Sequence, residues 1–252
     1  MLPTIIRYRD GDAQSGQYAN DDLDWAKPEQ RLTEIGQRLA RKLTQGPAID
    51  PAEGCESAKP PKEKAFPGAI VIKPKKAAEE DAKTVYRPDR SNSDLVIWSD
   101  GSKLDSEGVG TGIALKQGET WIQKGYPLGK TKEVFDAELY GLKKALDIAE
   151  NKLARNPHFK RLIILSDSQA ALKRASTDRL GPGQAIAIEI SAKAQALIDN
   201  GTQVTLQWVP SHIGIDGNEK ADTAAKGAAE SLSIPDIKRY SSFSYISRKI
   251  KA

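Results

Sequence analysis

The order of apolar segments in the second half of the chain limits the folds that it can adopt. Five runs have the composition and length of strands, at 95–99, 108–115, 120–126, 161–166 and 203–209. Four segments have helical periodicity or helix-start signals, near 134–151, 168–175, 183–199 and 216–230. Three strands joined by turns come first, and helices then alternate with strands. This succession predicts an α/β fold with a mixed sheet flanked by helices, and about 140 residues suffice for one core.

The first third of the chain has a different character. Nine of the 14 prolines lie in residues 1–90, and residues 45–90 are rich in Pro, Lys and Glu, which is typical of a linker. Within this part, helical periodicity predicts one amphipathic helix at 28–44, and a short apolar run makes 66–74 a strand candidate. We therefore expect three regions: a largely irregular N-terminal segment at 1–90, a catalytic domain at 91–230 and a C-terminal tail at 231–252.

Net charge and cysteine content limit the cellular compartments and the classes of binding partner that fit this chain. The net charge of +4 permits a polyanionic partner without requiring one. The single cysteine, Cys55, rules out an intramolecular disulfide and fits a reducing compartment. No apolar run approaches the ~18 residues that a membrane span needs, and the N-terminus lacks the apolar core of a secretory signal. We expect an intracellular monomer with no membrane association, and the sequence leaves nucleus and cytoplasm open.

Four acidic residues stand at strand ends or near helix starts. They are Asp100 in VIWSDGS, Glu138 in DAELYGL, Asp167 in IILSDSQ and Asp222 in GNEKADTAAK. Carboxylates gathered at one edge of a sheet cannot all stay ionised without cations. Ligand sets made only of oxygen suit Mg²⁺ or Mn²⁺. The pattern therefore favours a two-metal site for phosphoryl transfer on a nucleic acid.

Each acid also has a simpler explanation when taken alone, and Asp222 by itself would be an ordinary helix residue. Asp100 could be a surface residue in an Asx-turn. Glu138 could be a first-turn glutamate that the helix dipole favours, although it lies on the apolar stripe of its helix. Asp167 could be the N-cap of the helix that begins at 168. The functional interpretation depends on the four acids acting together.

The segment WVPSHIGIDGNEKAD connects the last strand to the last helix. Asp216 and Glu219 have the spacing of a capping box, which would place Asp222 in the second turn of an alanine-rich helix that packs closely on the sheet. His212 lies in the preceding loop and is one of two histidines in the chain. It could be an ordinary surface residue, or it could serve as a proton shuttle next to the fourth carboxylate.

Taken in order, DGS, AEL, SDSQ and WVPSHIGIDGNEKAD resemble the motifs of the type 1 ribonuclease H domain, over about residues 92–230. The resemblance implies a ribonuclease H-like five-stranded mixed sheet with strand order 3-2-1-4-5. It also implies an enzyme that cleaves the RNA strand of an RNA–DNA hybrid. The residues agree with that chemistry, because two-metal hydrolysis needs no nucleophilic side chain.

The same resemblance assigns roles to individual residues. Asp100 would bridge two Mg²⁺ ions, for which Mn²⁺ could substitute. Asp222 would hold the ion that activates water, and Glu138 and Asp167 the ion on the leaving-group side. His212 matches the family's loop histidine. Four further positions match substrate contacts: Gly101, Ser102, Gln169 and Asn218.

Two departures point to a particular branch of this family. Cellular enzymes often carry a basic, tryptophan-containing handle between the third and fourth acids, whereas 170–202 holds no tryptophan and four basic residues, Lys173, Arg174, Arg179 and Lys193. Val134 and Phe135 stand where polar residues often precede the helix glutamate. These features are more similar to ribonuclease H domains of non-LTR, LINE-type retrotransposon polyproteins, in which a reverse-transcriptase domain would be a partner.

Two other classes of protein remain open at this point. One is a catalytically weak or inactive nucleic-acid-binding remnant of such a polyprotein, although all four acids are present. The other is a different member of the same superfamily, such as a junction resolvase or an integrase. Those proteins lack the pairing of SDSQ with SHIGIDGNEKAD.

Overall fold

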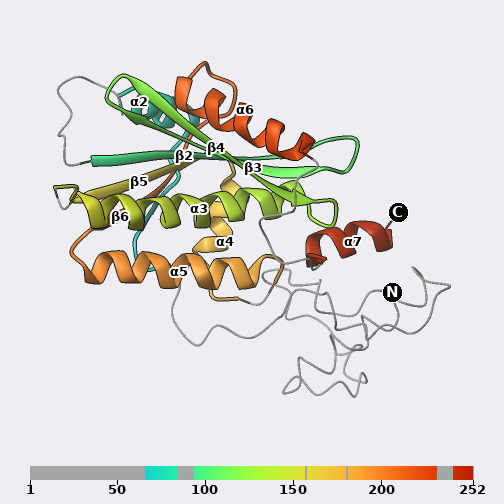
Figure 1. Cartoon of the computed structure of the whole chain (residues 1–252). Helices are drawn as coiled ribbons and strands as arrows, with labels where there is room; N and C mark the ends of the chain where they lie inside the picture. Colours follow the sequence, from blue (N-terminus) through green and yellow to red (C-terminus); the bar gives the residue numbers. More distant parts are fainter. Residues whose placement is uncertain (1–65, 85–93, 157, 180, 232–240, 252) are drawn as a thin grey trace.

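The computed structural model describes residues 66–84, 94–156, 158–179, 181–231 and 241–251 (Figure 1). The strands are β1 (Ala69–Val71), β2 (Asp94–Lys103), β3 (Val109–Gln117), β4 (Thr120–Gly129), β5 (Arg161–Ser166) and β6 (Gln203–Trp208). The helices are α2 (Lys75–Thr84), α3 (Val134–Arg155), α4 (Gln169–Ala175), α5 (Gln184–Asp199), α6 (Asp216–Glu230) and α7 (Phe243–Lys251). The helix predicted at 28–44 lies outside the described residues. None of the helices described is both long and apolar enough to span a bilayer.

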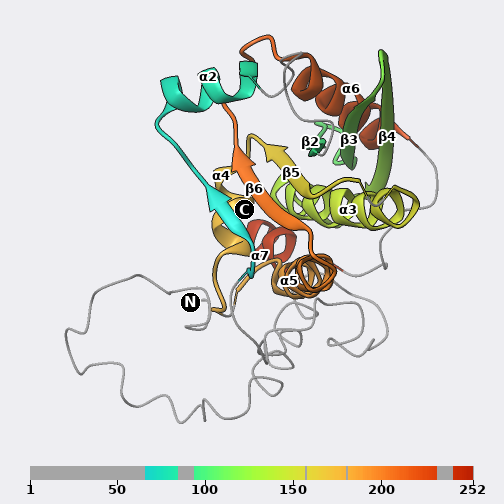
Figure 2. The same cartoon turned by 90° about the vertical axis from the view of Figure 1, so that its left-hand side faces the viewer.

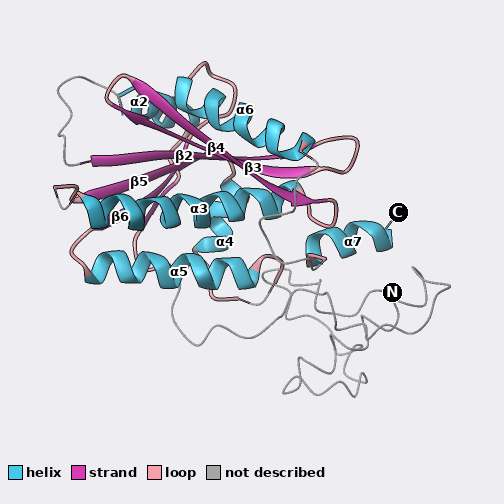
Figure 3. Ribbon diagram, in the orientation of Figure 1, coloured by secondary structure: helices cyan, strands magenta, loops and turns pink. Residues whose placement is uncertain are grey.

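All six strands form one sheet in the order β1-β6-β5-β2-β3-β4 (Figures 1 and 3). β2, β3 and β4 pair antiparallel, whereas β2, β5, β6 and β1 pair parallel. The five strands predicted from the sequence therefore occur in the expected 3-2-1-4-5 order, and the mixed α/β fold class is confirmed. The short strand β1 extends the sheet beside β6.

Helices cover both faces of the sheet (Figure 2). The larger apolar cluster lies between the sheet and α3, α4 and α5, and includes Ile97, Leu142 and Ile190. The smaller cluster lies on the opposite face, beneath α6 and α2, and includes Trp98 and Ala221. Successive residues of β2 enter opposite clusters, as the two-residue period of a strand requires. β2 is thus buried on both faces, and its C-terminal half carries Asp100 between the two helix layers.

Helix α6 lies unusually close to the sheet, as its alanine content predicts. A Cβ on Gly112 of β3 would collide with the carbonyl oxygen of Ala221, and Ala225 is also fully buried at this contact. Small residues on both elements allow the two backbones to approach each other. The close contact brings the second turn of α6, with Asp222, over the end of β2.

Residues 66–84 do not behave as the linker that their composition favoured. Residues 69–71 pair parallel with residues 205–207 of β6. Phe66 is buried in the larger cluster, and Ala78 and Ala82 bury one side of α2. Alanines spaced i, i+4 let a short polar helix pack closely, which explains why a sequence rich in Lys and Glu still contributes to the core. The strand candidate at 66–74 is confirmed.

The helix starts differ in detail from the prediction. α6 begins at Asp216 with Ile215 as its N-cap, so Asp216 and Glu219 do not form the expected capping box. A related contact occurs instead at α3, where the Asp136 carboxylate accepts a hydrogen bond of 2.7 Å from the backbone N–H of Glu133. The acid at 216 still lies in the first turn of α6, where the helix dipole favours it.

Candidate active site

The ends of the two central parallel strands bring Asp100 and Asp167 together. Ser99 of β2 pairs with Ser166 of β5, so the residues that follow them lie side by side. Asp100 is 6% exposed, which excludes the surface Asx-turn, and its Oδ1 accepts a hydrogen bond of 2.7 Å from the Gly101 amide. Asp167 is not the N-cap of α4, because Ser168 takes that position and accepts from the Ala171 amide.

Glu138 enters the same space from the first turns of α3. It is 7% exposed, and its Oε2 has no hydrogen-bond partner among the described residues. A first-turn glutamate placed only for the helix dipole would stay in solvent, so that explanation does not fit. A buried carboxylate oxygen without a partner is costly unless a cation or proton satisfies it.

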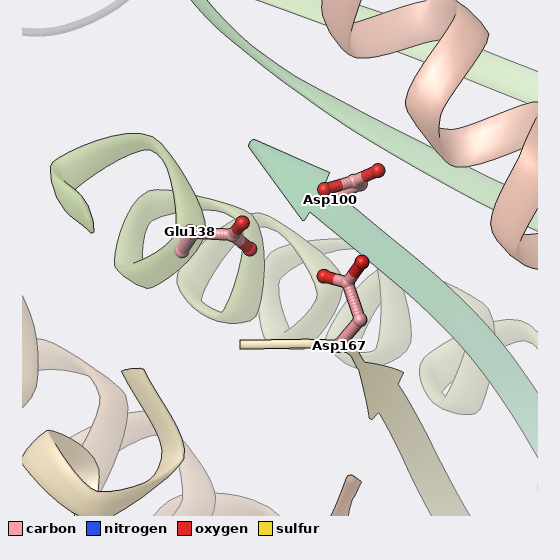
Figure 4. A group of neighbouring side chains, drawn as sticks. All are labelled: Asp100, Glu138 and Asp167. Atoms are coloured by element: carbon pink, nitrogen blue, oxygen red, sulfur yellow. The ribbon is translucent and has the colours of Figure 1, made fainter. Parts of the chain in front are cut away.

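Asp100, Glu138 and Asp167 form one carboxylate cluster (Figure 4). One carboxylate oxygen from each residue lies within 4.8 Å of those of the other two. Burial, followed by the neighbouring Asp167 carboxylate, raises the pKa of Asp100 to about 7. Burial and the Asp100 carboxylate raise the pKa of Glu138 well above its ordinary value, and burial raises that of Asp167. The cluster therefore favours protons or a divalent cation over three free charges.

Asp222 lies beside this cluster without being part of it. Its negative charge contributes to the raised pKa values of Asp100 and Asp167. Its carboxylate forms an ion pair of 2.7 Å with Lys226, one turn further along α6. The cation of Lys226 thus neutralises the fourth acid, and a metal ion that bound here would compete with that lysine.

His212 is exposed in the turn between β6 and α6, and its backbone has a φ of 53°. A left-handed conformation is uncommon for residues other than glycine. The charge of a protonated His212 would lower the pKa of Asp167, which places the imidazole within electrostatic reach of the cluster. The role of His212 as a proton shuttle stays a prediction, since an ordinary surface residue would also be exposed.

The four predicted substrate contacts have different surroundings. Gly101 and Ser102 continue β2 past Asp100, and Ser102 is buried. Gln169 is the first residue of α4 and is half-buried. Asn218 is 3% exposed. Burial raises the pKa of Asp167, and the nearby Asn218 side chain acts in the opposite direction. Asn218 therefore lies close to a member of the cluster, a placement that the sequence did not predict.

Two other supporting residues were not anticipated. Lys226 follows Asp222 by four residues, a spacing at which helical side chains meet, so the ion pair was visible in the sequence. Trp208 ends β6, and its indole Nε1–H donates a hydrogen bond of 3.0 Å to the backbone carbonyl of Asp167. That contact links the ends of two neighbouring strands, and no local sequence pattern predicts it.

The donor set fits a hard divalent cation. Every candidate ligand is a carboxylate, which is the ligand type that Mg²⁺ and Mn²⁺ prefer over softer metals. The partnerless Oε2 of Glu138 and the raised pKa values of the cluster are the features that a bound cation would relieve. Asp100, Glu138 and Asp167 could hold one ion together, and Asp222 could contribute to a second.

Known proteins give the family to which this arrangement belongs. No curated protein sequence matches the chain. Among solved structures, RNase H1 from the halophilic archaeon Halobacterium salinarum is 20% identical, with a TM-score of 0.41, over 54% of this chain and 96% of that one. The N-terminal RNase H domain of a Mycobacterium tuberculosis protein, solved as a fusion with maltose-binding protein, is 22% identical, with a TM-score of 0.42, over 54% and 99%.

A viral protein is also similar. The prototype foamy virus protease–reverse transcriptase is 21% identical, with a TM-score of 0.43, over 59% of this chain and 23% of that one. The sequence profile of the RNase H family matches residues 92–230. That match covers more than half of the 252 residues, includes all four acids and His212, and shows that the chain belongs to the RNase H family.

Proposed function

We propose that this chain is an endoribonuclease of type 1 that cleaves the RNA strand of RNA–DNA hybrids. The carboxylate cluster supports this proposal most strongly, because it joins two buried acids, from β2 and α3, and one half-buried acid, from the end of β5, within 4.8 Å. The family match supports the ribonuclease assignment. When bound, two Mg²⁺ ions would activate water and stabilise the charge that develops at the phosphate.

The side chains would divide the work by position. Asp100 is the cluster member on β2 and would contact both ions. Glu138 and Asp167 would hold the ion on the leaving-group side, and Asp222, released from Lys226, the ion on the water side. His212 would carry protons between the site and solvent from its exposed turn. Water adds across the bond between phosphorus and the 3′ oxygen, which leaves a 3′-hydroxyl and a 5′-phosphate.

Affinity for the hybrid should be low in the isolated chain. Lys193 is the only basic residue of α5, and it pairs with Asp147 at 2.7 Å and with Glu150 at 3.4 Å. Because phosphate contacts supply much of the affinity for nucleic acids, a helix with its one cation neutralised contributes little. This shortage supports an origin in a retrotransposon-type polyprotein, where a reverse-transcriptase domain would supply the missing contacts.

The substrate class can be tested with matched duplexes. One RNA sequence, labelled at its 5′ end, is presented as an RNA–DNA hybrid and as duplex RNA, and the same sequence is presented as labelled duplex DNA, each with and without Mg²⁺. We expect cleavage of the hybrid alone and only with Mg²⁺. Binding of the hybrid without any cleavage would instead identify an inactive remnant. Cleavage of duplex DNA would point to a resolvase-like or integrase-like activity.

A further inference from the structure

The C-terminal helix α7 contacts the helix that carries Glu138. It lies at the N-terminal end of α3 (Figure 1). The backbone N–H of Ser242 donates to the Thr131 carbonyl at 3.1 Å. The Ser242 hydroxyl donates to Oδ2 of Asp136 at 2.5 Å, the same oxygen that accepts from the Glu133 amide. Ile246 is 5% exposed, so the helix also buries an apolar side chain here.

Arg248 extends this contact through two glutamates. Its Nε donates to Glu133 at 2.6 Å, and its Nη2 donates to Glu107 at 2.6 Å. Lys103, at the end of β2, bridges the same two glutamates, with 2.9 Å to Glu133 and 3.0 Å to Glu107. We call these five residues, Lys103, Glu107, Glu133, Ser242 and Arg248, the α7 clasp. It joins β2, the β2–β3 turn, the start of α3 and α7.

Within the clasp the pair of Lys103 with Glu133 is partly buried, whereas the side chains of Arg248 and Glu107 are 39% and 34% exposed. The side chains of Lys103 and Glu133 are 17% and 15% exposed. Partly buried pairs are screened less by salt than exposed pairs, which contribute little to stability. Arg248 also constrains the geometry, because its planar guanidinium directs Nε and Nη2 from one rigid group to two different carboxylates.

The clasp lies next to two members of the carboxylate cluster. Lys103 follows Asp100 by three residues on β2, and Glu133 precedes Glu138 by five residues at the start of α3. Between these points the first turns of α3 rest directly on Gly101, so the two elements are in contact where the acids emerge. A force that holds α3 against β2 therefore also sets the separation of Asp100 and Glu138.

We propose that the α7 clasp holds the start of α3 against β2 and thereby fixes Asp100 and Glu138 at metal-binding distance. Ser242 and Arg248 are positioning residues in this arrangement, since neither belongs to the carboxylate cluster. The inference rests on the proposed function in one respect, namely that the cluster binds a divalent cation. Direct binding of nucleic acid by Arg248 is disfavoured, because its Nε and Nη2 already contact carboxylates.

Three variants of the full chain test the clasp. Arg248→Ala removes both ion pairs, and Arg248→Lys keeps the charge but loses the fork. Lys251→Ala is the matched control, because it removes one positive charge from an exposed position of the same helix. Mn²⁺ binding is measured by calorimetry, and amide hydrogen exchange of residues 136–139 is measured in the metal-free protein.

We expect Arg248→Ala to weaken Mn²⁺ binding by about 10-fold, the lower end of the range for partners that support metal ligands. It should also speed amide exchange at the start of α3, with partial recovery in Arg248→Lys and no change in Lys251→Ala. Unchanged metal binding and exchange in Arg248→Ala would overturn the inference. Equal loss of hybrid affinity in Arg248→Ala and Lys251→Ala, with metal binding intact, would overturn it in favour of nucleic-acid contact.

The exchange measurement separates this inference from the proposed function. If the unaltered chain binds no Mn²⁺, the metal site is wrong, yet faster exchange in Arg248→Ala would still show that α7 holds the start of α3. If the unaltered chain binds Mn²⁺ and cleaves hybrid while Arg248→Ala behaves identically in every measurement, the clasp alone is wrong.

Discussion

A Cβ built on Gly101 would lie 2.7 Å from the backbone nitrogen of Glu138. The glycine that follows the first acid therefore makes room for the helix that delivers the second. Real Cβ atoms essentially never approach that closely, and the obstacle is backbone that cannot rotate away. The DGS and AEL motifs are thus two sides of one contact between β2 and α3.

Gly101→Ala should damage the site through this contact. We expect a loss of about 1–3 kcal/mol in the free energy of unfolding, as for overpacking elsewhere, together with weaker metal binding as α3 moves outward. Chemical denaturation and calorimetry would measure both. Gly227→Ala is the control, since its Cβ would meet nothing within 4 Å on α6, and it should stabilise the protein by about 0.5–1 kcal/mol. Equal stability of the two variants would contradict the close packing.

The metal-free protein should lose stability as the pH rises through the acidic range. The ordinary pKa of an aspartate is 3.8, and burial with the Asp167 charge raises the pKa of Asp100 to about 7 in the folded state. The folded state then binds more protons than the unfolded state between about pH 4 and 7, so the free energy of unfolding falls as the pH increases. Thermal unfolding in EDTA would show a declining Tm over this window.

Mg²⁺ should remove most of that decline, because the cation replaces the protons. Asp100→Asn should also flatten the curve in EDTA, since it deletes one charge from the cluster. A metal-free Tm that rises steadily from pH 4 to pH 7 would show that the three carboxylates do not repel one another as described.

His212 should assist turnover without holding metal. His212→Ala is expected to slow cleavage by about 10–100-fold, in the lower part of the range for general acid–base assistance. Because the backbone φ is 53° here, alanine also introduces local strain, whereas asparagine tolerates this conformation. His212→Asn therefore isolates the chemical role, and both variants should be slowed alike in single-turnover assays. Normal rates in His212→Asn would assign the histidine to loop geometry.

Much of the fold and of the site could be predicted, because local sequence patterns and residue spacing indicate them. Strand length, helical periodicity and strand-end acids identified the five central strands and placed Asp100, Glu138 and Asp167 in one region. The continuous apolar run of β2 and the alanines of α6 are local signals. The pairing of Ser99 with Ser166 is a consequence of parallel neighbours, which the predicted strand order already required.

The remaining features depend on contacts between distant residues. The linker interpretation was wrong for 66–84, because composition does not reveal that β6 offers an unpaired edge to Ala69–Val71. The capping box predicted at the start of α6 was wrong, and a related contact occurs at the start of α3 instead. The residue spacing of a capping box also occurs by chance. The contact of Arg248 with Glu107 spans 141 positions, and no local pattern encodes it.

The boundary of the catalytic unit can now be tested at two positions. Chains that begin at Phe66 and at Ser91 both retain the four acids and His212, so both should cleave the hybrid with Mg²⁺. The shorter chain loses the pairing of β1 with β6 and the burial of Phe66, Ala78 and Ala82, and we expect it to be less stable by about 2–4 kcal/mol. A folded but inactive shorter chain would assign 66–84 to the catalytic unit.

The most direct test compares the unaltered chain with Asp100→Asn on a hybrid whose RNA strand carries a 5′ label. We predict Mg²⁺-dependent cleavage by the unaltered chain, products with 3′-hydroxyl ends, and no cleavage in EDTA. Asp100→Asn should cleave at the background rate while keeping an equal or higher Tm, since the substitution removes one carboxylate of the cluster and one repelling charge. Full activity in Asp100→Asn, or in EDTA, would contradict a metal-dependent site at this cluster.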